Sequence, residues 1–338
     1  GKPTSNSSSR VVMEMRACFG AKVLLVGLVV GLASPRAWIG HGNPRERLPR
    51  HVATHASSST AEGSRPTVAV VGANGRTGSL VVEALLKDGL AKPVAVTRSG
   101  SWNAMDDSTN DVEVRQADVT DPSSLVAALA GVSAVVFAAA YSRGKTEPKD
   151  VDNEGLVNCA KVVLQDKIER LIVVSSASVT RPFAPVGILL NTIGSGVLNE
   201  KLEGENRIKE MLQGSESSYT IVRPGGLTTD PADGFLELQF NQGDTYVGNV
   251  ARADVAAVCA VAATDPLNSG ANKTFEMFKA RTRNPLLPWF RGKTRYVIPG
   301  LRDCGAMLAR LRPDKEVYDV PGQWPLSLDD FKLNLPQK

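Results

Sequence analysis

Histidine is nearly absent from this 338-residue chain, and all three copies precede residue 66. Imidazole is a frequent general base in enzymes and the commonest metal ligand in proteins. The chain beyond residue 66 therefore excludes Ser-His-Asp triads, histidine general bases and histidine-ligated metals. The three histidines are His41, His51 and His55.

Cysteine is also sparse, and beyond residue 66 only Cys159, Cys259 and Cys304 occur. They are far apart and form no Cys-x-x-Cys pair, so neither a zinc site nor a disulfide framework is expected. Cys159 and Cys259 fall within apolar helical patterns, which favours buried small residues. We predict no metal site.

Charge is unevenly spread along the chain. The net charge is +4, but residues 1–66 hold nine Lys/Arg against three Asp/Glu. The remainder has 30 basic and 32 acidic residues, a net charge of −2. A nearly neutral folded part argues against a nucleic-acid partner, because such proteins usually carry a basic surface.

Residues 1–65 are predicted to be a targeting leader. Residues 23–33 form an 11-residue apolar run after Arg16 and Lys22, which is typical of a signal peptide and short for a membrane span. Residues 38–65 are rich in arginine and serine and poor in acids, like a transit peptide. This bipartite pattern is typical of proteins sent to complex plastids, and the alternative is a secreted protein. We expect the mature chain to begin between Ala37 and Pro66.

The first ordered feature is a strand, a glycine turn and a helix. Residues 67–71 are β-favouring, Gly72, Gly75 and Gly78 follow, and residues 79–87 have an apolar helical stripe. The glycines permit a tight turn, a close approach of backbone to a pyrophosphate, and close packing of helix on strand. The free N–H groups of the helix N-terminus would bind the phosphates. This pattern predicts a dinucleotide-binding site.

The chain then alternates strands and helices, which predicts a doubly wound α/β fold with a parallel sheet and helices on both faces, of the Rossmann type. We assign this domain to residues 66–279. Further strands are expected at 93–97, 112–116, 133–138, 170–174, 219–223 and 273–278, and helices at 122–129, 149–165, 194–212 and 253–263.

Residues 280–338 differ, because seven prolines and a cluster of five basic residues between 281 and 295 occur there. We expect a small C-terminal extension that packs on the domain surface, with a short helix at 303–311. The alternative is a docking segment that contacts a partner or a membrane surface.

Arg98 follows the second predicted strand, where an acid would bind the ribose of NAD(H) and an arginine would suit the 2′-phosphate of NADP(H). Arg76, within the glycine turn, is a second candidate for this phosphate. NADP(H) is therefore the expected cofactor. Asp118, after the third strand, is expected either to bind the adenine amine or to cap a turn. Ala138 and Ala139 would let the cofactor lie close.

The motifs GANGRTG, Asp118-Val119, Ser175-Ser176 and RPGGL at 223–227 resemble those of atypical short-chain dehydrogenases/reductases, particularly the NmrA-like branch with plastid Tic62-type members. The similarity covers about residues 66–278. It implies an NAD(P)-binding Rossmann domain. The predicted cofactor-binding residues are Gly72, Asn74, Gly75, Arg76, Thr77, Gly78, Arg98, Asp118, Ala138, Ala139, Ser175, Lys201, Pro224 and Gly225.

One departure from the family concerns catalysis. Catalytic members use Tyr-x-x-x-Lys on the helix after the fifth strand, but here Lys201 is preceded four residues earlier by Val197. Valine cannot transfer a proton. Tyr141-x-x-x-Lys145 follows a different strand, and we interpret it as a coincidence. Ser175 and Lys201 are the candidate catalytic residues, although a serine here could instead cap the strand end.

Two functions remain open. The first is an NADPH-dependent oxidoreductase that lacks the usual catalytic tyrosine and acts on an unknown small molecule. The second is a non-catalytic NADP(H)-binding scaffold or assembly subunit of a plastid photosynthetic complex. RNA binding is disfavoured by the nearly neutral domain. NADPH consumption would separate the first two.

Overall fold

The computed structural model describes residues 65–87, 89–104, 112–142, 144–181, 191–192, 194–244, 248–280 and 296–317. The predicted leader, with its cleavage region, lies outside the described residues, as does the basic cluster at 281–295. Among the described residues, no helix is long and apolar enough to cross a membrane.

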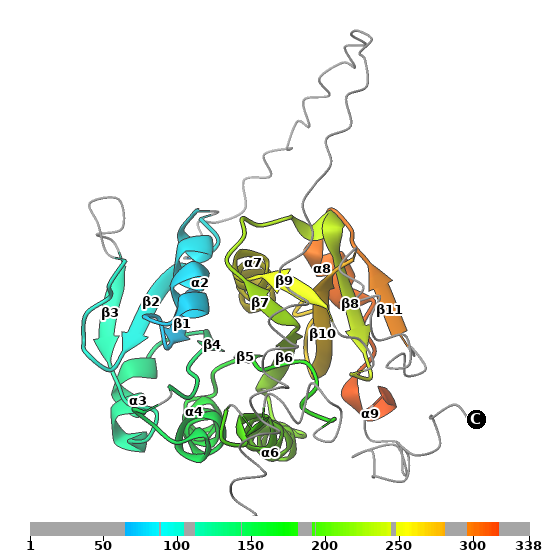
Figure 1. Cartoon of the computed structure of the whole chain (residues 1–338). Coiled ribbons are helices and arrows are strands. Elements are labelled where there is room, and N and C mark those ends of the chain that lie inside the picture. The colour runs from blue at the N-terminus through cyan, green and yellow to red at the C-terminus, as the bar shows by residue number, and fades with distance from the viewer. Residues whose placement is uncertain are drawn as a thin grey trace, which may run out of the picture. The chain divides into compact units, whose positions relative to one another are not determined.

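A nine-stranded sheet forms the centre of the fold, in the order β11-β8-β10-β6-β5-β4-β1-β2-β3 (Figure 1). The seven strands from β10 to β3 are parallel, and β8 and β11 pair antiparallel at one edge. The strands are β1 Thr67–Val71, β2 Lys92–Thr97, β3 Glu113–Gln116, β4 Ala134–Phe137, β5 Arg170–Val174, β6 Ser218–Pro224, β8 Leu238–Gln242, β10 Lys273–Lys279 and β11 Tyr296–Pro299.

Helices cover both faces of this sheet, which confirms the doubly wound architecture. One apolar core joins the sheet to α2 (Arg76–Lys87), α7 (Arg252–Thr264) and α8 (Cys304–Ala309). The opposite core joins it to α3 (Pro122–Leu129), α4 (Leu156–Gln165) and α6 (Val197–Leu212), which Figure 1 shows together. Asp121 caps α3, because its side chain accepts from the N–H of Ser123.

The segment predicted as one helix at 149–165 is two elements. It begins as a π-helix, η1 (Lys149–Gly155), and continues as α4. The wider first turns bury Asp152 and Asn153 against neighbouring elements. Helical periodicity does not distinguish these two helix types over seven residues, so this difference was not predicted.

The sequence reading missed several short strands and helices. The strand β8 contains two buried polar residues, Asn241 and Gln242. They interrupt the apolar pattern by which a buried strand is recognised in a sequence. The strand β11 lies in the segment predicted as a surface extension, yet it pairs with β8 as the last strand of the sheet. Also unpredicted were β7 (Gly226–Thr228), η2 (Phe235–Glu237), β9 (Asn249–Ala251) and α9 (Asp314–Val317); β7 and β9 form a separate parallel pair.

Candidate dinucleotide site

The glycine turn lies at the carboxyl end of β1, where the order of strands reverses between β2 and β4. Gly72 has φ +86°, a conformation that favours glycine. A Cβ atom here would lie 2.7 Å from the backbone nitrogen of Ala139. The Gly72 N–H donates to the carbonyl of Val96 at 3.0 Å. The turn is thus held between the ends of β4 and β2, the usual ligand position in open α/β sheets.

The other two glycines shape the entry to α2. A Cβ on Gly78 would lie 2.3 Å from the carbonyl oxygen of Gly72, so close packing of helix on strand requires glycine. A Cβ on Gly75 would lie 3.0 Å from the same oxygen, and Gly75 itself is exposed. The helix begins at Arg76, and its first turn, which includes half-buried Thr77, contains no acidic residue. This cradle fits a pyrophosphate.

Asn74 holds the loop after β2 against this turn. Its Nδ2 donates to the Ser101 carbonyl at 2.8 Å, and its Oδ1 accepts from the Asn103 N–H at 2.8 Å. The buried Trp102 adds a bond from Nε1 to the Ala73 carbonyl at 3.2 Å. These contacts give Asn74 a structural role, which the sequence reading had not foreseen, and its predicted contact with the cofactor stays a prediction.

Three arginines are candidates for a phosphate: Arg76 begins α2, Arg98 follows β2, and Arg252 begins α7. Arg98 and Arg76 are exposed, and neither forms an ion pair within the part of the chain that the structure describes. Arg252, the first residue of α7, is buried and donates to the Thr228 carbonyl at 3.1 Å. Burial lowers the pKa of Arg252, and the nearby charge of Arg76 lowers it further. Arg252 was not predicted as a site residue from the sequence, because it belongs to no recognised motif.

Asp118 has the geometry of a turn cap. Its Oδ1 accepts from both the N–H and the hydroxyl of Thr120, at 2.9 and 2.8 Å. Its backbone N–H and carbonyl both bond to the hydroxyl of Ser124 at 3.0 Å. Of the two predicted roles, these contacts support capping, and adenine binding stays a prediction.

Lys201 lies on α6 and forms an ion pair with Asp152 of η1, at 2.7 Å between Nζ and Oδ1. The Asp152 side chain is fully buried. Its Oδ2 accepts from the backbone N–H of Tyr141, after β4, at 2.8 Å. Asp152 thus connects the lysine to the segment that begins with Ala138 and Ala139. The sequence reading missed Asp152, which the π-helix turns inward.

Ser175 follows β5 and is buried, and its N–H donates to the Val222 carbonyl at 2.8 Å. Its Oγ is buried and makes no hydrogen bond within the described residues, but the hydroxyl helps to lower the pKa of Glu205. Ser176 bonds locally, from Oγ to the Ala177 carbonyl at 3.0 Å. Val197 is the first residue of α6. Neither serine is shown to act in catalysis.

Pro224 and Gly225 lie at the end of β6 and make packing contacts. The Pro224 carbonyl accepts from the N–H of Ala177 at 2.9 Å. A Cβ on Gly225 would lie 2.2 Å from the Gly248 carbonyl oxygen and 2.5 Å from the Phe278 ring. Glycine is therefore required by packing, and the predicted cofactor contact of both residues stays a prediction.

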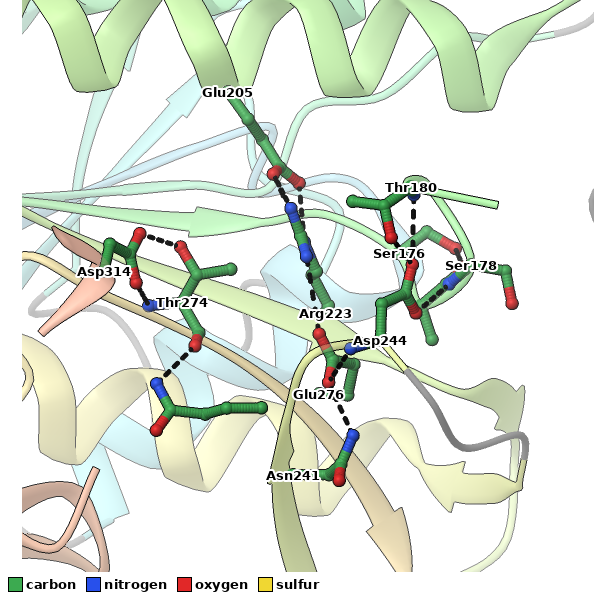
Figure 2. A network of polar contacts seen from close by, with 12 residues as sticks. Ser176, Ser178, Thr180, Glu205, Arg223, Asn241, Asp244, Thr274, Glu276 and Asp314 are labelled. Carbon is green, nitrogen blue, oxygen red and sulfur yellow. Dashed lines mark hydrogen bonds and ion pairs between the residues drawn. The ribbon is translucent and has the colours of Figure 1, made fainter. Parts of the chain in front are cut away.

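A buried polar network connects β6, β10 and α6 with the segment after β5 (Figure 2). Arg223 of β6 pairs with Glu205 of α6 at 2.5 Å and with Glu276 of β10 at 3.4 Å. Burial alone would raise the pKa of Glu205, but Arg223 outweighs it and the pKa is lowered. Burial, with the nearby Asp244 charge, raises the pKa of Glu276 to about 7.

Comparison with known proteins agrees with this site. A family model described as NAD(P)H-binding matches residues 72–266. The chain is 33% identical over 202 residues to a chloroplastic protein of Arabidopsis thaliana, covering 56% of this chain and 69% of that protein. It is 31% identical over 260 residues to the chloroplastic protein Tic62 of Oryza sativa subsp. japonica, covering 70% of this chain but only 50% of the rice protein.

The fold is shared with solved structures. One is a short-chain dehydrogenase/reductase from Veillonella parvula in complex with NADP, with a TM-score of 0.51 and 18% identity. The match covers 65% of this chain and 97% of that one. The family match spans more than half of the chain and begins at the first glycine of the turn. The chain therefore belongs to the NAD(P)H-binding family and has a Rossmann fold.

Proposed function

We propose that this protein is an NADP(H)-dependent oxidoreductase. One structural connection carries the proposal. The segment after β4 packs Ala139 against Gly72 of the cradle, and two residues later the Tyr141 N–H binds Asp152, the partner of Lys201. A dinucleotide with its pyrophosphate on the glycine turn would extend along this segment towards Lys201. The lysine would then hold the nicotinamide ribose, as the resemblance to the family implies.

The preference for NADP(H) rests on charge. Arg98 and Arg76 flank the cradle, and no acid pairs with either in the described ranges. A guanidinium binds a phosphate through two parallel hydrogen bonds, whereas NAD(H) offers only hydroxyls at that position. The relative from Veillonella parvula, which shares the fold, was solved with NADP.

The bound cofactor would supply a hydride equivalent. Val197 occupies the usual position of the tyrosine and cannot donate the accompanying proton. Acceptors that take their proton from water suit such a site, and quinones are an example: quinone, NADPH and H⁺ give hydroquinone and NADP⁺. The chain's own contribution is to orient donor and acceptor.

NADPH oxidation, followed at saturating cofactor with a panel of quinones, flavins and carbonyl compounds, tests this proposal. We expect turnover of at least one acceptor, and Lys201→Met should reduce it. The exposed Lys87→Met is the matched control, because Lys87 lies at the far end of α2. NADPH binding without consumption across the panel would contradict the enzymatic function.

The absent tyrosine favours a second candidate, a non-catalytic NADP(H)-binding scaffold or assembly subunit of a plastid photosynthetic complex. The similarity to Tic62 agrees with this role. It predicts that the protein co-migrates with a membrane complex in native extracts, and that the amount bound changes with the ratio of NADP⁺ to NADPH. Because β11 and α8 of the predicted extension at 280–338 belong to the sheet and its core, the other parts of that extension would contact the partner or the membrane surface.

We also propose a plastid location, because two relatives are named chloroplastic and the leader has a bipartite pattern. Mass spectrometry of native protein should find an N-terminus between Ala37 and Pro66. A chain that keeps residues 23–33 would contradict cleavage of the signal peptide. Recovery of the processed protein from the medium would support the secreted alternative.

A further inference from the structure

The loop that follows β5, residues 175–181, is fixed by Asp244. The carboxylate of Asp244 accepts from the Ser178 N–H at 2.7 Å, and from the Thr180 N–H and hydroxyl at 3.0 and 2.6 Å (Figure 2). The last described residue of this segment is Arg181, whose N–H donates to the Ser178 carbonyl at 3.1 Å. This bond fixes the backbone of Arg181, from which the side chain extends.

Arg181 is largely buried, and among the described residues its side chain has no hydrogen-bond or ion-pair partner. Its Nε is buried and makes no hydrogen bond, and the guanidinium forms no ion pair within the described ranges. Burial lowers the pKa of Arg181, although the charges of Asp244 and Glu276 act in the opposite direction. An arginine remains protonated at any physiological pH, so the buried charge needs compensation. Asp244 and Glu276 supply part of it through their charges, without a direct ion pair in the described ranges.

The two neighbouring acids are engaged elsewhere. Asp244 binds the loop backbone and Thr180. Glu276 pairs with Arg223 and accepts from Asn241 and from the N–H of Asp244, at 2.8 and 2.9 Å. Their charges act on Arg181, and neither forms an ion pair with it within the part of the chain that the structure describes.

The position of Arg181 suits an acceptor. Its loop follows β5, which pairs with β4, and the segment after β4 leads to Asp152 and Lys201. In the proposed function, this side of the switch point receives the nicotinamide half of the cofactor. The cationic group thus lies on the half of the sheet edge away from Arg98 and the adenosine end.

We propose that Arg181 binds a carboxylate of the hydride acceptor, so that the natural substrate is an organic acid. The inference rests on the proposed function for the location of the acceptor. A carboxylate offers two oxygens in the plane of the guanidinium. The negative charge of Asp244 near Arg181 favours a singly charged carboxylate over a doubly charged phosphate.

Paired ligands that differ only in charge test this assignment. The full chain, loaded with NADP⁺, is titrated calorimetrically with 2-naphthoate and 2-naphthamide, and with benzoate and benzamide. We expect at least one acid to bind about tenfold more tightly than its amide, which is the preference that one charge-assisted bond supplies. Arg181→Gln should reduce this preference to less than about twofold, and Arg181→Lys should retain part of it.

The controls separate this site from the rest of the protein. Arg310→Gln removes an exposed guanidinium and should leave the preference unchanged. Unchanged NADP⁺ affinity in Arg181→Gln would show that the variant is folded. No preference in the wild type, or an equal preference in Arg181→Gln, would overturn the assignment. Failure of NADP⁺ to bind would instead contradict the proposed function, and the same titrations without cofactor would still test Arg181.

Discussion

The Asp152 carboxylate contacts Lys201 through one oxygen, at 2.7 Å, and holds the backbone of Tyr141 through the other, at 2.8 Å. One fully buried acid therefore couples α6 to the segment after β4. The lysine that the family motif places in the site has a defined position even without the tyrosine of that motif.

This coupling predicts a strong interaction in a double-mutant cycle. Asp152→Asn should lower the free energy of unfolding by about 3 kcal/mol, because it leaves a largely buried ammonium without its partner. Adding Lys201→Met should restore part of the loss. Urea denaturation of the four proteins gives the cycle. Simple additivity of the two single changes would show that the pair is not coupled.

Arg98→Ala is expected to affect the two dinucleotides differently. NADPH binding should weaken by about one to two decades, the equivalent of one charge-assisted bond of roughly 1.5–3 kcal/mol. NADH binding should barely change, and the loss should shrink with rising salt. Calorimetric titration measures both, with Lys92→Ala, an exposed cation at the other end of β2, as control. An equal loss of affinity for both cofactors would refute a role for Arg98 in binding the 2′-phosphate of NADP(H).

Gly75→Asp should abolish dinucleotide binding while the protein stays soluble and folded. The added Cβ would lie 3.0 Å from the Gly72 oxygen, and the carboxylate would occupy the space of the pyrophosphate and repel it. Lys87→Gln makes the same change in net charge at the far end of α2 and should leave binding intact. Retained NADPH affinity in Gly75→Asp would contradict the location of the site.

Glu276 should make stability depend on pH. Its pKa is raised from 4.5 to about 7, so between these pH values the unfolded chain releases a proton that the folded protein keeps. The wild type should therefore lose stability relative to Glu276→Gln as pH rises through this window, by about 3 kcal/mol in total. Chemical denaturation from pH 4 to 8 measures the difference. The exposed Glu210→Gln should show no such trend, and a flat difference for Glu276→Gln would contradict the raised pKa.

Much of the fold was predictable because its signals are local. The strand at 67–71, the strand at 170–174 and the helix at 122–129 have the predicted bounds. Apolar runs predict the two strands, and the proline after Asp121 predicts where the helix begins. By contrast, β8 was missed because Asn241 and Gln242 are buried polar residues whose partners come from distant segments.

The sequence alone determined that this chain has a glycine turn between a strand and a helix, a parallel α/β core and an arginine after the second strand. These features depend on the size of the side chains, on the spacing of apolar residues and on the order of the elements along the chain. Only the tertiary structure decided that Asp152 holds Lys201, that Asn74 anchors a loop, and that Arg181 is largely buried without an ion-pair partner in the described part of the chain. Such facts depend on contacts between residues far apart in sequence, and on how completely folding removes water from each charge.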